Sequence, residues 1–527
     1  MSKLKEIFKK WWRPNGWRPY FIIFILGFTL YGQTLFFDYS YFDDQSLILE
    51  NAPILSSFKN IETVFTSDAF FSVNKYYYRP LLNLSFMVEM QLGGTLPFIY
   101  HFGNILIHIL VVFLIFRLFV QLKFKLELAW FFSILFLVHP VLVQAVAWIP
   151  GRNDSLLALF VLAAFNVFLA FKEKPRLLYY LAYLGFFTLA LFTKETAAIL
   201  PIIVIYYFSV AERNQVSKTD KWLIIFGSLA VGIVWYIFRR LALGSDPVTL
   251  EILILSIYNN LPAFLVSLGK AFLPFNLSVL PILTDSKIIY GFIVLPLFLL
   301  ALFASKKKDW RQLGLGTVWF ILFLLPSLVR LNPVDTPDFL EHRLYLPLIG
   351  LFIIIAEIDW IKNLDWQKKI VKFIALGIII LFFTLSWHHE QVFKNRITFW
   401  QSAVKTSPHS ALANRNLGAM YYLDDQKDSA IKYYRRALEI NPTEPMAHNN
   451  IGLIYSERGS YGQAEKELKK ELSLYPNYDK ALFNLGHLYY KQKRLTEAAE
   501  LWQAALKVNP NYYEAYSSLL NLSNQLR

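Results

Sequence analysis

The chain has 527 residues, of which 56% are hydrophobic and 17% aromatic, and its mean hydropathy is +0.39. This composition excludes an ordinary soluble globular protein and predicts an integral membrane protein. The formal net charge is +14, but the basic residues stand in short clusters between apolar runs, which is typical of loops at a membrane face rather than of a nucleic-acid-binding surface. Because the chain contains no cysteine, disulfides, thiol catalysis and thiolate metal sites are excluded.

Eleven apolar runs have a length close to that needed to cross the hydrocarbon core as helices. They lie near residues 20–37, 99–120, 127–149, 155–171, 177–193, 196–211, 222–238, 288–304, 313–330, 344–360 and 371–387. The first run follows several basic residues and lacks a cleavage site of small residues, so we expect a retained span with a cytoplasmic N-terminus. The apolar stretch 261–283 contains three prolines, and we expect it to be re-entrant or interfacial.

The basic clusters agree with this assignment, because five of them fall on the N-terminal side of the membrane. They lie near residues 117–125, 172–176, 213–221, 306–311 and 362–372. With eleven spans, the loop 38–98 and the C-terminal domain share the opposite, outer side. We expect a bacterial inner membrane, with the acidic loop and the C-terminal domain in the periplasm.

We place the end of the membrane domain 1–390 at about residue 390, and from about Ser410 onward the sequence becomes amphipathic and polar. Glycines recur 34 residues apart, at Gly418, Gly452 and Gly486. This spacing is typical of tetratricopeptide repeats, in which two antiparallel helices pack closely and successive units stack. The domain 391–527 is predicted to contain a half repeat at 396–408, full repeats at 411–444, 445–478 and 479–512, and a cap helix at 513–526. Glu471 departs from the pattern, which expects a small residue there.

The first outer loop, 38–98, is too long for a simple connector and contains the acidic pair Asp43 and Asp44. A carboxylate at the edge of an apolar phase can take a proton from an attacking hydroxyl or hold a cation. Alternatively, the pair caps a helix that begins at Gln45, because aspartate is a preferred N-cap residue.

Four basic side chains stand at outer ends of spans or in outer loops, where positive charge is otherwise scarce. They are Arg79, Arg152, Lys194 and Arg343. Together they could surround the phosphate of a lipid-linked donor, since arginine offers a bidentate fork and lysine a point charge. Alternatively, three of them pair with acidic neighbours in sequence, Arg152 with Asp154, Lys194 with Glu195 and Arg343 with Glu341.

Other chemistries find little support in the residues. The histidines of the apolar helices, His139 among them, lack a partner at the spacing typical of zinc ligands, and no glycine-rich phosphate loop or nucleophile elbow occurs. No cofactor is indicated, and a divalent metal is possible without being supported by any motif.

These segments, in this order and ahead of the repeats, resemble the polytopic GT-C-class protein O-mannosyltransferases that carry C-terminal tetratricopeptide repeats. The matching segments are Phe42-Asp43-Asp44, Tyr78-Arg79-Pro80-Leu81, His101-Phe102-Gly103-Asn104, His139-Pro140-Val141, Gly151-Arg152-Asn153-Asp154, Lys194-Glu195-Thr196 and His342-Arg343-Leu344-Tyr345.

The resemblance implies an inverting transfer of a hexose, such as mannose, from a polyprenyl-phosphate donor. The role of base carries onto Asp43 or Asp44, and phosphate contacts carry onto Arg152, Lys194 and Arg343, with Arg79 added from its position. The supporting residues are then His139, Asp154, Glu195, His342 and Tyr345. One departure is Gln144, where the family usually has glutamate, which leaves the particular sugar or acceptor open.

Asparagines repeat at one phase of the repeats, at Asn416, Asn450 and Asn484. Such amides can bind the backbone of an extended acceptor peptide, although asparagine also occurs at this phase in repeats with other partners.

The sequence therefore predicts an all-α protein, a bundle of about eleven spans followed by a tetratricopeptide solenoid. We expect it to transfer a hexose from a polyprenyl-phosphate donor to Ser or Thr hydroxyls of exported proteins held by the repeats. One alternative is the same donor chemistry on a lipid or envelope-glycan acceptor. Another is a non-catalytic membrane scaffold for envelope assembly.

Overall fold

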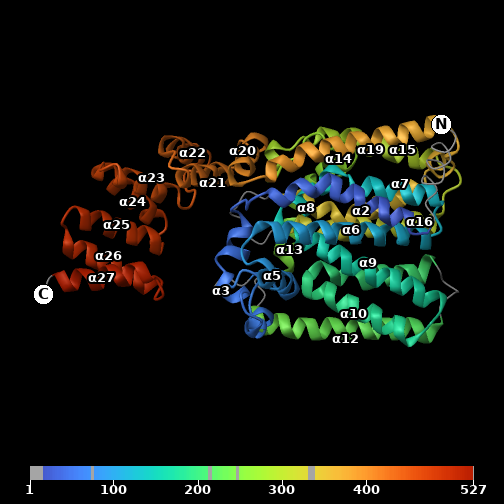
Figure 1. Cartoon of the computed structure of the whole chain (residues 1–527), viewed down its shortest axis with the longest axis horizontal. Coiled ribbons are helices and arrows are strands. Elements are labelled where there is room, and N and C mark those ends of the chain that lie inside the picture. Colours follow the sequence, from blue (N-terminus) through green and yellow to red (C-terminus); the bar gives the residue numbers. More distant parts are fainter. Residues whose placement is uncertain (1–15, 73–75, 212–216, 245–248, 330–338, 526–527) are drawn as a thin grey trace. The chain divides into compact units, whose positions relative to one another are not determined.

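The computed structural model describes residues 16–72, 76–211, 217–244, 249–329 and 339–525, and these residues form helices and connecting segments without a β-strand (Figure 1). The chain divides into two compact units, Met1–Phe399 and Trp400–Arg527. The division falls inside helix α20 (Arg396–Thr406) rather than at residue 390. The reason is that Phe399 packs within the first unit, with its ring centroid 6.2 Å from that of Phe42 and 6.5 Å from that of Trp148.

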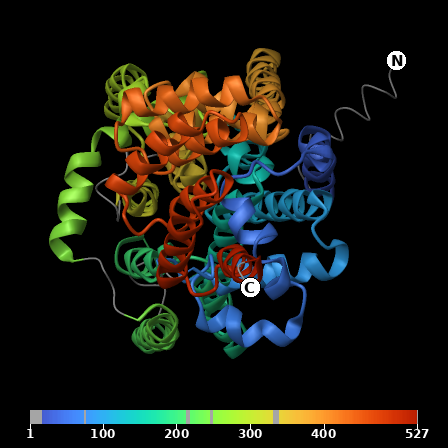
Figure 2. The ribbon, with the colours of Figure 1, turned by 90° about the vertical axis from the view of Figure 1, so that its left-hand side faces the viewer.

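Among the described residues of the first unit, six helices are long and apolar enough to cross a membrane; α2 and α16 reach this length only with an adjoining short helix. In chain order they are α2 (Arg18–Tyr31), α6 (Pro97–Gln121), α9 (Arg152–Glu173), α12 (Lys218–Leu243), α16 (Trp310–Leu324) and α19 (Lys369–Glu390). Figure 2 views the long helices of this unit roughly along their axes. Their exposed apolar side chains, such as those of α12, suit contact with lipid.

Shorter or bent helices complete the bundle. The pair α7 (Leu126–Leu137) and α8 (Val143–Ala147) is bent by 49°, and the pair α13 (Leu250–Asn260) and α14 (Pro262–Phe272) by 51°. The shorter apolar helices are α10 (Leu177–Thr193), α11 (Leu200–Tyr206), α15 (Ile289–Ala304) and α17 (Tyr345–Ala356). By length and composition the described residues hold six to eight spans, and the count of eleven stays a prediction because it includes these shorter helices.

The predicted re-entrant stretch 261–283 corresponds to the second half of the bent pair. The structure begins helix earlier, at Leu250, and breaks it at Leu261, next to Pro262. Proline at the first position of a helix is tolerated because its missing N–H would have no intrahelical partner there.

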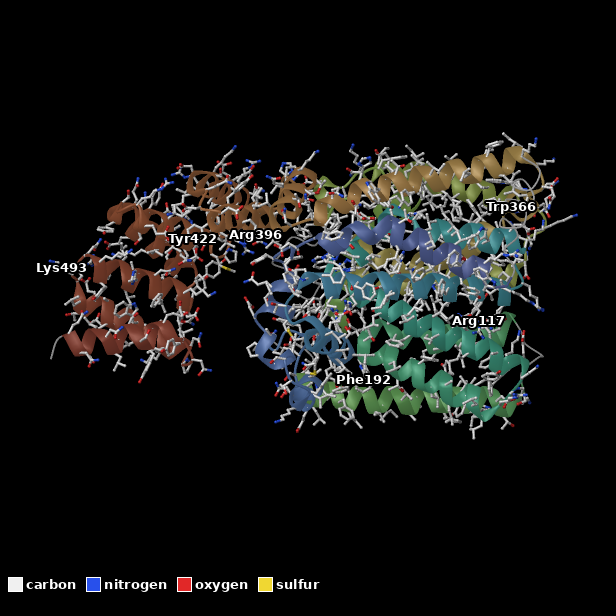
Figure 3. The ribbon with its side chains drawn as sticks, viewed as in Figure 1. Arg117, Phe192, Trp366, Arg396, Tyr422 and Lys493 are labelled. Carbon is white, nitrogen blue, oxygen red and sulfur yellow. The ribbon has the colours of Figure 1, made fainter. Side chains whose placement is uncertain are left out.

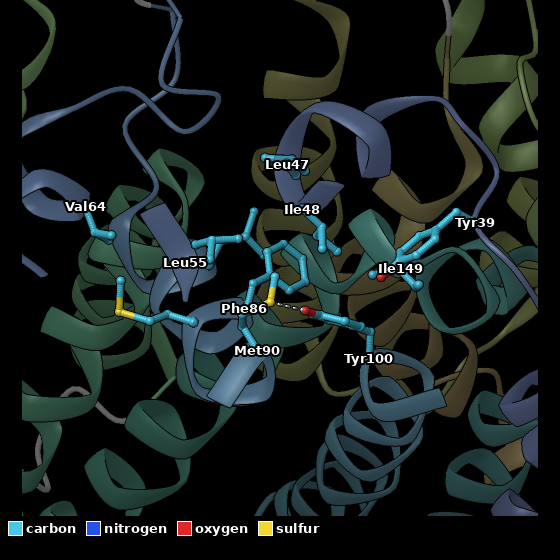
Figure 4. Packing of buried hydrophobic residues seen from close by; sticks show 11 residues of the cluster. Tyr39, Leu47, Ile48, Leu55, Val64, Phe86, Met90, Tyr100 and Ile149 are labelled. Atoms are coloured by element: carbon cyan, nitrogen blue, oxygen red, sulfur yellow. Dashed lines mark hydrogen bonds between the residues drawn. The ribbon is translucent and has the colours of Figure 1, made fainter. Parts of the chain in front are cut away.

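The outer loop 38–98 folds into short helices: η2 (Gln45–Leu49), α3 (Ala52–Leu55), η3 (Phe58–Asn60), α4 (Ile61–Thr66) and α5 (Pro80–Gly93). Their apolar side chains form one buried cluster, which Figure 4 shows around Phe86, with Ile48 and Leu55 from the loop and Tyr100 from α6. The Tyr100 hydroxyl lies 3.8 Å from the sulfur of Met90. The loop is thus a packed layer and not a free connector.

A buried guanidinium connects this layer to the bundle. Arg152, at the start of α9, donates from Nε to Asn104 Oδ1 and from Nη2 to the Tyr100 carbonyl, each at 2.6 Å, and pairs through Nη1 with Glu89 of α5. Its Cζ lies 4.8 Å from the centroid of the Phe86 ring. Because a buried charge is costly unless it is paired and hydrogen-bonded, these partners hold α5, α6 and α9 in one arrangement.

The second unit consists of helix pairs: α21 (Ala411–Leu423) with α22 (Lys427–Ile440), α23 (Ala447–Glu457) with α24 (Tyr461–Leu474), and α25 (Asp479–Lys491) with α26 (Leu495–Val508), followed by α27 (Tyr513–Gln525). The repeated glycines lie where the two helices of a pair meet. A Cβ on Gly418, Gly452 or Gly486 would stand 2.9, 2.7 or 2.7 Å from a side-chain atom of the facing helix. The small residue therefore permits the close packing that the 34-residue pattern predicts.

Glu471, the departure from the repeat pattern, has a specific partner. Its buried carboxylate accepts from the backbone N–H of Met446 at 2.8 Å and of Asn449 at 3.1 Å, at the start of α23. Met446 is the N-cap residue of α23, has φ of +68° and supplies no side-chain cap. Glu471 thus binds first-turn N–H groups that would otherwise lack a partner.

We expect Glu471→Ala to loosen the start of α23, because the N–H groups of Met446 and Asn449 lose their acceptor, at a cost of about 1–3 kcal/mol for a buried group. Hydrogen exchange of the full chain, followed by mass spectrometry, should show faster exchange at residues 446–450. Glu439→Ala is the control, since Glu439 is exposed and pairs with Arg436 on the same helix. Equal exchange in the two variants would contradict the capping role.

We expect Arg152→Met to lower the unfolding temperature of the purified protein strongly, because breaking a buried ion pair costs about 3–5 kcal/mol and leaves the Glu89 carboxylate unpaired. Combining it with Glu89→Leu removes that unpaired charge and should restore part of the loss. If the double variant is no more stable than Arg152→Met, the buried charge is not the cause. Thermal unfolding in detergent measures both.

Candidate active site

A cavity of about 520 Å³ lies between the outer loop and the ends of several helices of the first unit. Its lining combines charged, aromatic and apolar side chains from segments far apart in sequence. The titratable residues of the lining are Asp43, Arg79, Asp154, Lys194, Glu195, Arg239, His342 and Arg343, together with three neighbouring tyrosines, Tyr76, Tyr77 and Tyr78. The structure therefore brings together most of the site residues that the sequence indicates.

The two aspartates of the acidic pair have different positions. Asp43 lines the cavity, whereas Asp44 is buried beneath it and is the N-cap residue of η2. The Asp44 carboxylate accepts from the N–H groups of Ser40, Phe42 and Gln45 at 2.6, 2.9 and 3.1 Å. Burial raises the pKa of Asp44, and these hydrogen bonds lower it in part. Asp44 thus holds the loop conformation that places Asp43.

A charged cluster stands opposite the acidic loop. Lys194, between α10 and η6 (Glu195–Ile199), donates to both carboxylate oxygens of Asp154 at 2.9 and 2.8 Å. His342 Nε2 lies 3.4 Å from Asp154 Oδ2, and Arg79 Nη2 lies 3.5 Å from Glu195 Oε1. Asp154 therefore orients Lys194 and His342 from the first turn of α9.

The short helix η10 (Glu341–Leu344) carries His342 and Arg343 into the lining. Glu341 itself points away: its buried Oε1 accepts from Lys270 Nζ and from the Ser278 N–H, each at 2.7 Å. Burial raises the pKa of Glu341, and Lys270 lowers it in part. This pair fixes η10 from behind the cavity.

Gln144 supports the same helix. Its Oε1 accepts from the N–H groups of Glu341 and His342 at 3.0 and 3.3 Å, and its Nε2 donates to the Val279 carbonyl at 2.9 Å. A glutamate carboxylate here would lack the N–H that binds Val279. Gln144 is not part of the cavity lining, so this departure from the family pattern acts on the support of η10.

Besides Asp44, three predicted site residues of the first unit lie away from the cavity lining. Arg152 is enclosed by its partners in the bundle, including Glu89, and its geometry does not support a phosphate contact. His139 is buried, with Nε2 3.0 Å from the Ala271 carbonyl oxygen, and Tyr345 is buried with its hydroxyl at His108.

The pairing of basic residues with acidic neighbours in sequence is wrong for Arg152 and Lys194. Arg152 pairs with Glu89, and Lys194 pairs with Asp154. Glu341, the expected partner of Arg343, instead binds Lys270. The reason is that partners in a helical bundle are set by which helix ends meet.

Arg239 and the aromatic side of the lining were not foreseen. Arg239 is near the end of α12, and its Cζ lies 5.9 Å from the Trp235 ring centroid. Its position at the outer end of a predicted span is the signal that identified the other basic residues. Phe42 stacks on Trp148 with ring centroids 5.7 Å apart, and both line the cavity.

In the repeat unit, the predicted asparagines are half-buried and bind neighbouring side chains. Asn484 Nδ2 donates to Asn449 Oδ1 at 2.9 Å, Asn449 Nδ2 donates to Asn450 Oδ1 at 3.0 Å, and Asn416 Oδ1 accepts from Arg415 Nε at 3.3 Å. Peptide binding by these amides stays a prediction. Within the described parts of the chain, no group of three or more His, Asp and Glu side chains is arranged to hold a metal ion.

Two kinds of protein-family model match the chain. Residues 80–238 match dolichyl-phosphate-mannose-protein mannosyltransferase, a segment that includes Arg152, Asp154 and Lys194 and stops within α12, one residue before Arg239. Residues 411–444 and 479–512 match one tetratricopeptide repeat model, and residues 433–466 match another.

Several curated relatives are named protein O-mannosyl-transferases. F38B6.6 of Caenorhabditis elegans is 24% identical over 77% of this chain and 60% of its own length. Human TMTC3 is 24% identical over 73% of this chain and 47% of its own, and human TMTC4 is 27% identical over 65% and 55%. The chain thus spans about half of each relative. In both its membrane unit and its repeats, it resembles the protein O-mannosyltransferases that carry tetratricopeptide repeats.

Proposed function

We propose that this protein is a membrane glycosyltransferase that moves a hexose, such as mannose, from a polyprenyl-phosphate donor to Ser or Thr hydroxyls of exported proteins. The observation that carries the proposal is the lining of the large cavity. It places the Asp43 carboxylate in the same space as Arg79, Lys194, Arg239 and Arg343, which come from four different segments. The likeness to protein O-mannosyltransferases supports the same reaction.

The charges of the lining suit an anionic donor. Four basic side chains, which are those of Arg79, Lys194, Arg239 and Arg343, accompany three carboxylates, which are those of Asp43, Asp154 and Glu195. Lys194 pairs with Asp154 and Arg79 with Glu195, and Arg239 and Arg343 line the same cavity as further candidate ligands of a phosphate. A guanidinium offers paired N–H donors that match phosphate oxygens.

The transfer would proceed in one displacement. Asp43 takes the proton of the acceptor hydroxyl as its oxygen forms a bond to the anomeric carbon of the sugar. The bond between that carbon and the phosphate oxygen breaks on the opposite face, which inverts the configuration. Polyprenyl phosphate leaves with the bonding electron pair, and the arginines stabilise its negative charge.

The repeats would hold the acceptor protein, since tetratricopeptide arrays bind extended segments. Asn416, Asn450 and Asn484 are the candidate contacts to its backbone. We place the N-terminus in the cytoplasm and the acidic loop and the repeats in the periplasm of a bacterial inner membrane, because five basic clusters share the N-terminal side.

Replacing Asp43 by asparagine should lower the rate of transfer about 10²- to 10⁴-fold, because the amide cannot accept the proton. Its unfolding temperature should stay near that of the wild type. The measurement is incorporation of radiolabelled hexose in membranes supplied with polyprenyl-phosphate sugars, with label counted separately in protein and lipid.

Asp44→Asn is the matched neighbour. It should lower the unfolding temperature, because the amide NH₂ group would face backbone N–H groups that now donate hydrogen bonds to the Asp44 carboxylate.

Full transfer by Asp43→Asn would exclude Asp43 as the base. Label in lipid alone would move the acceptor to a lipid, and no label with any donor would favour the scaffold.

Arg239→Gln should lower kcat/KM for the donor about tenfold or more, since a charged hydrogen-bond donor is lost from the phosphate region. Arg240→Gln is the control, because Arg240 is adjacent and exposed but does not line the cavity. The same kcat/KM in both variants would remove Arg239 from the donor site. Initial rates at varied donor concentration provide this comparison.

A further inference from the structure

A second cavity, of about 360 Å³, lies at the opposite end of the first unit. The start of α16 lines it at Asp309, Arg311 and Gln312, whereas the other end of the same helix lines the large cavity at Phe323. Figure 3 labels Arg117 and Trp366 near this end of the unit and Phe192 near the other. The two cavities are therefore separate sites.

Three of the five basic clusters in the sequence meet at this second cavity. Lys123 and Lys125 reach it from the turn between α6 and α7, Arg311 from the start of α16, and Lys362 from the end of α18 (Asp359–Lys362). Basic residues of separate loops that only contact solvent have no reason to line the same cavity. Their convergence here is a property of the fold and has no role in the proposed transfer reaction.

The carboxylates in the lining already have partners. Glu357, which is buried, accepts from Lys362 Nζ at 2.6 Å and from the Asp309 N–H at 2.8 Å. Asp309 Oδ1 accepts from the Arg311 N–H at 2.9 Å as the cap of α16. The four basic side chains exceed these two carboxylates by two positive charges.

Lys123 and Lys125 provide this excess. Both are exposed, and within the described residues neither forms an ion pair with a carboxylate. Lys123 has φ of +64° and follows Leu122, the C-cap residue of α6, and Lys125 is the N-cap residue of α7 without a side-chain cap.

The walls are preformed and partly apolar. The Asp359 carboxylate accepts from the backbone N–H groups of Lys306 at 2.6 Å and Lys307 at 3.0 Å, which joins the α15–α16 loop to α18. Leu122, Phe124 and Leu128 contribute apolar lining beside the lysines. A cationic rim beside apolar side chains suits a ligand with an anionic head and a hydrocarbon part.

We propose that this second cavity binds a phosphate group, supplied by the headgroup of an anionic phospholipid or by free phosphate, with Lys123 and Lys125 as its main contacts. Lipid phosphates lie at the depth where loop lysines end a span. The inference does not rest on the transfer reaction, since the binding measurement requires no substrate.

The test uses the purified full chain in a neutral detergent. Unfolding temperature is followed by tryptophan fluorescence during titration with phosphatidylglycerol in mixed micelles, with phosphatidylcholine in the same micelles, and with sodium phosphate against sodium chloride of equal ionic strength. The variant is Lys123→Asn with Lys125→Gln, because asparagine tolerates the left-handed backbone at position 123. The control is Lys368→Gln with Lys369→Gln, which removes the same charge from exposed positions outside the cavity.

Phosphatidylglycerol should raise the unfolding temperature of the wild type and the control, and bind the Lys123/Lys125 variant at least about tenfold more weakly. The same pattern with sodium phosphate would assign the site to the free ion, and its absence would assign it to the lipid. An equal response of the two double variants, or no response of the wild type to either probe, would overturn the proposal. Melting temperatures in phosphatidylcholine show that both variants fold.

Discussion

The buried guanidinium of Arg152 is the interaction on which the geometry of the first unit depends. In a bundle surrounded by lipid, a charge needs partners of opposite charge and hydrogen-bond acceptors within the protein. Arg152 finds them on α5 and α6, through Glu89, Tyr100 and Asn104. A side chain on Gly103 would collide with the Glu89 carboxylate and stand 2.9 Å from Arg152 Nη2. The packing therefore requires glycine there.

The shape of the large cavity depends on the arrangement of helices that Arg152 stabilises. Asp154 follows Arg152 on the first turn of α9 and, from there, holds Lys194 and His342. On the other side, Asp44 fixes the turn that places Asp43, and Trp148 Nε1 donates to Ser40 Oγ of that turn at 3.0 Å. In each of these two segments, one residue stabilises the local structure and a nearby residue lines the cavity.

This division explains which of the predicted residues line the cavity and which do not. The charged residues of the outer loop and span ends were visible because positive charge is scarce there, and Arg79, Lys194 and Arg343 do line the cavity. Arg152 carries the same signal but is a structural residue. An arginine that lines the cavity and an arginine that supports the bundle can both stand at the outer end of a span, so position in the sequence does not distinguish the two roles.

The sequence by itself determined the helical class and the repeats, because a run of apolar residues or a 34-residue period is a local property that any packing must satisfy. It also indicated the acidic loop and most of the charged residues of the cavity. The tertiary structure decided the partners: Asp154 for Lys194, Lys270 for Glu341, and the backbone of α23 for Glu471. It also decided that Asp43 rather than Asp44 faces the cavity. These choices depend on which helix ends meet, and that is set by side-chain packing between segments far apart in the chain.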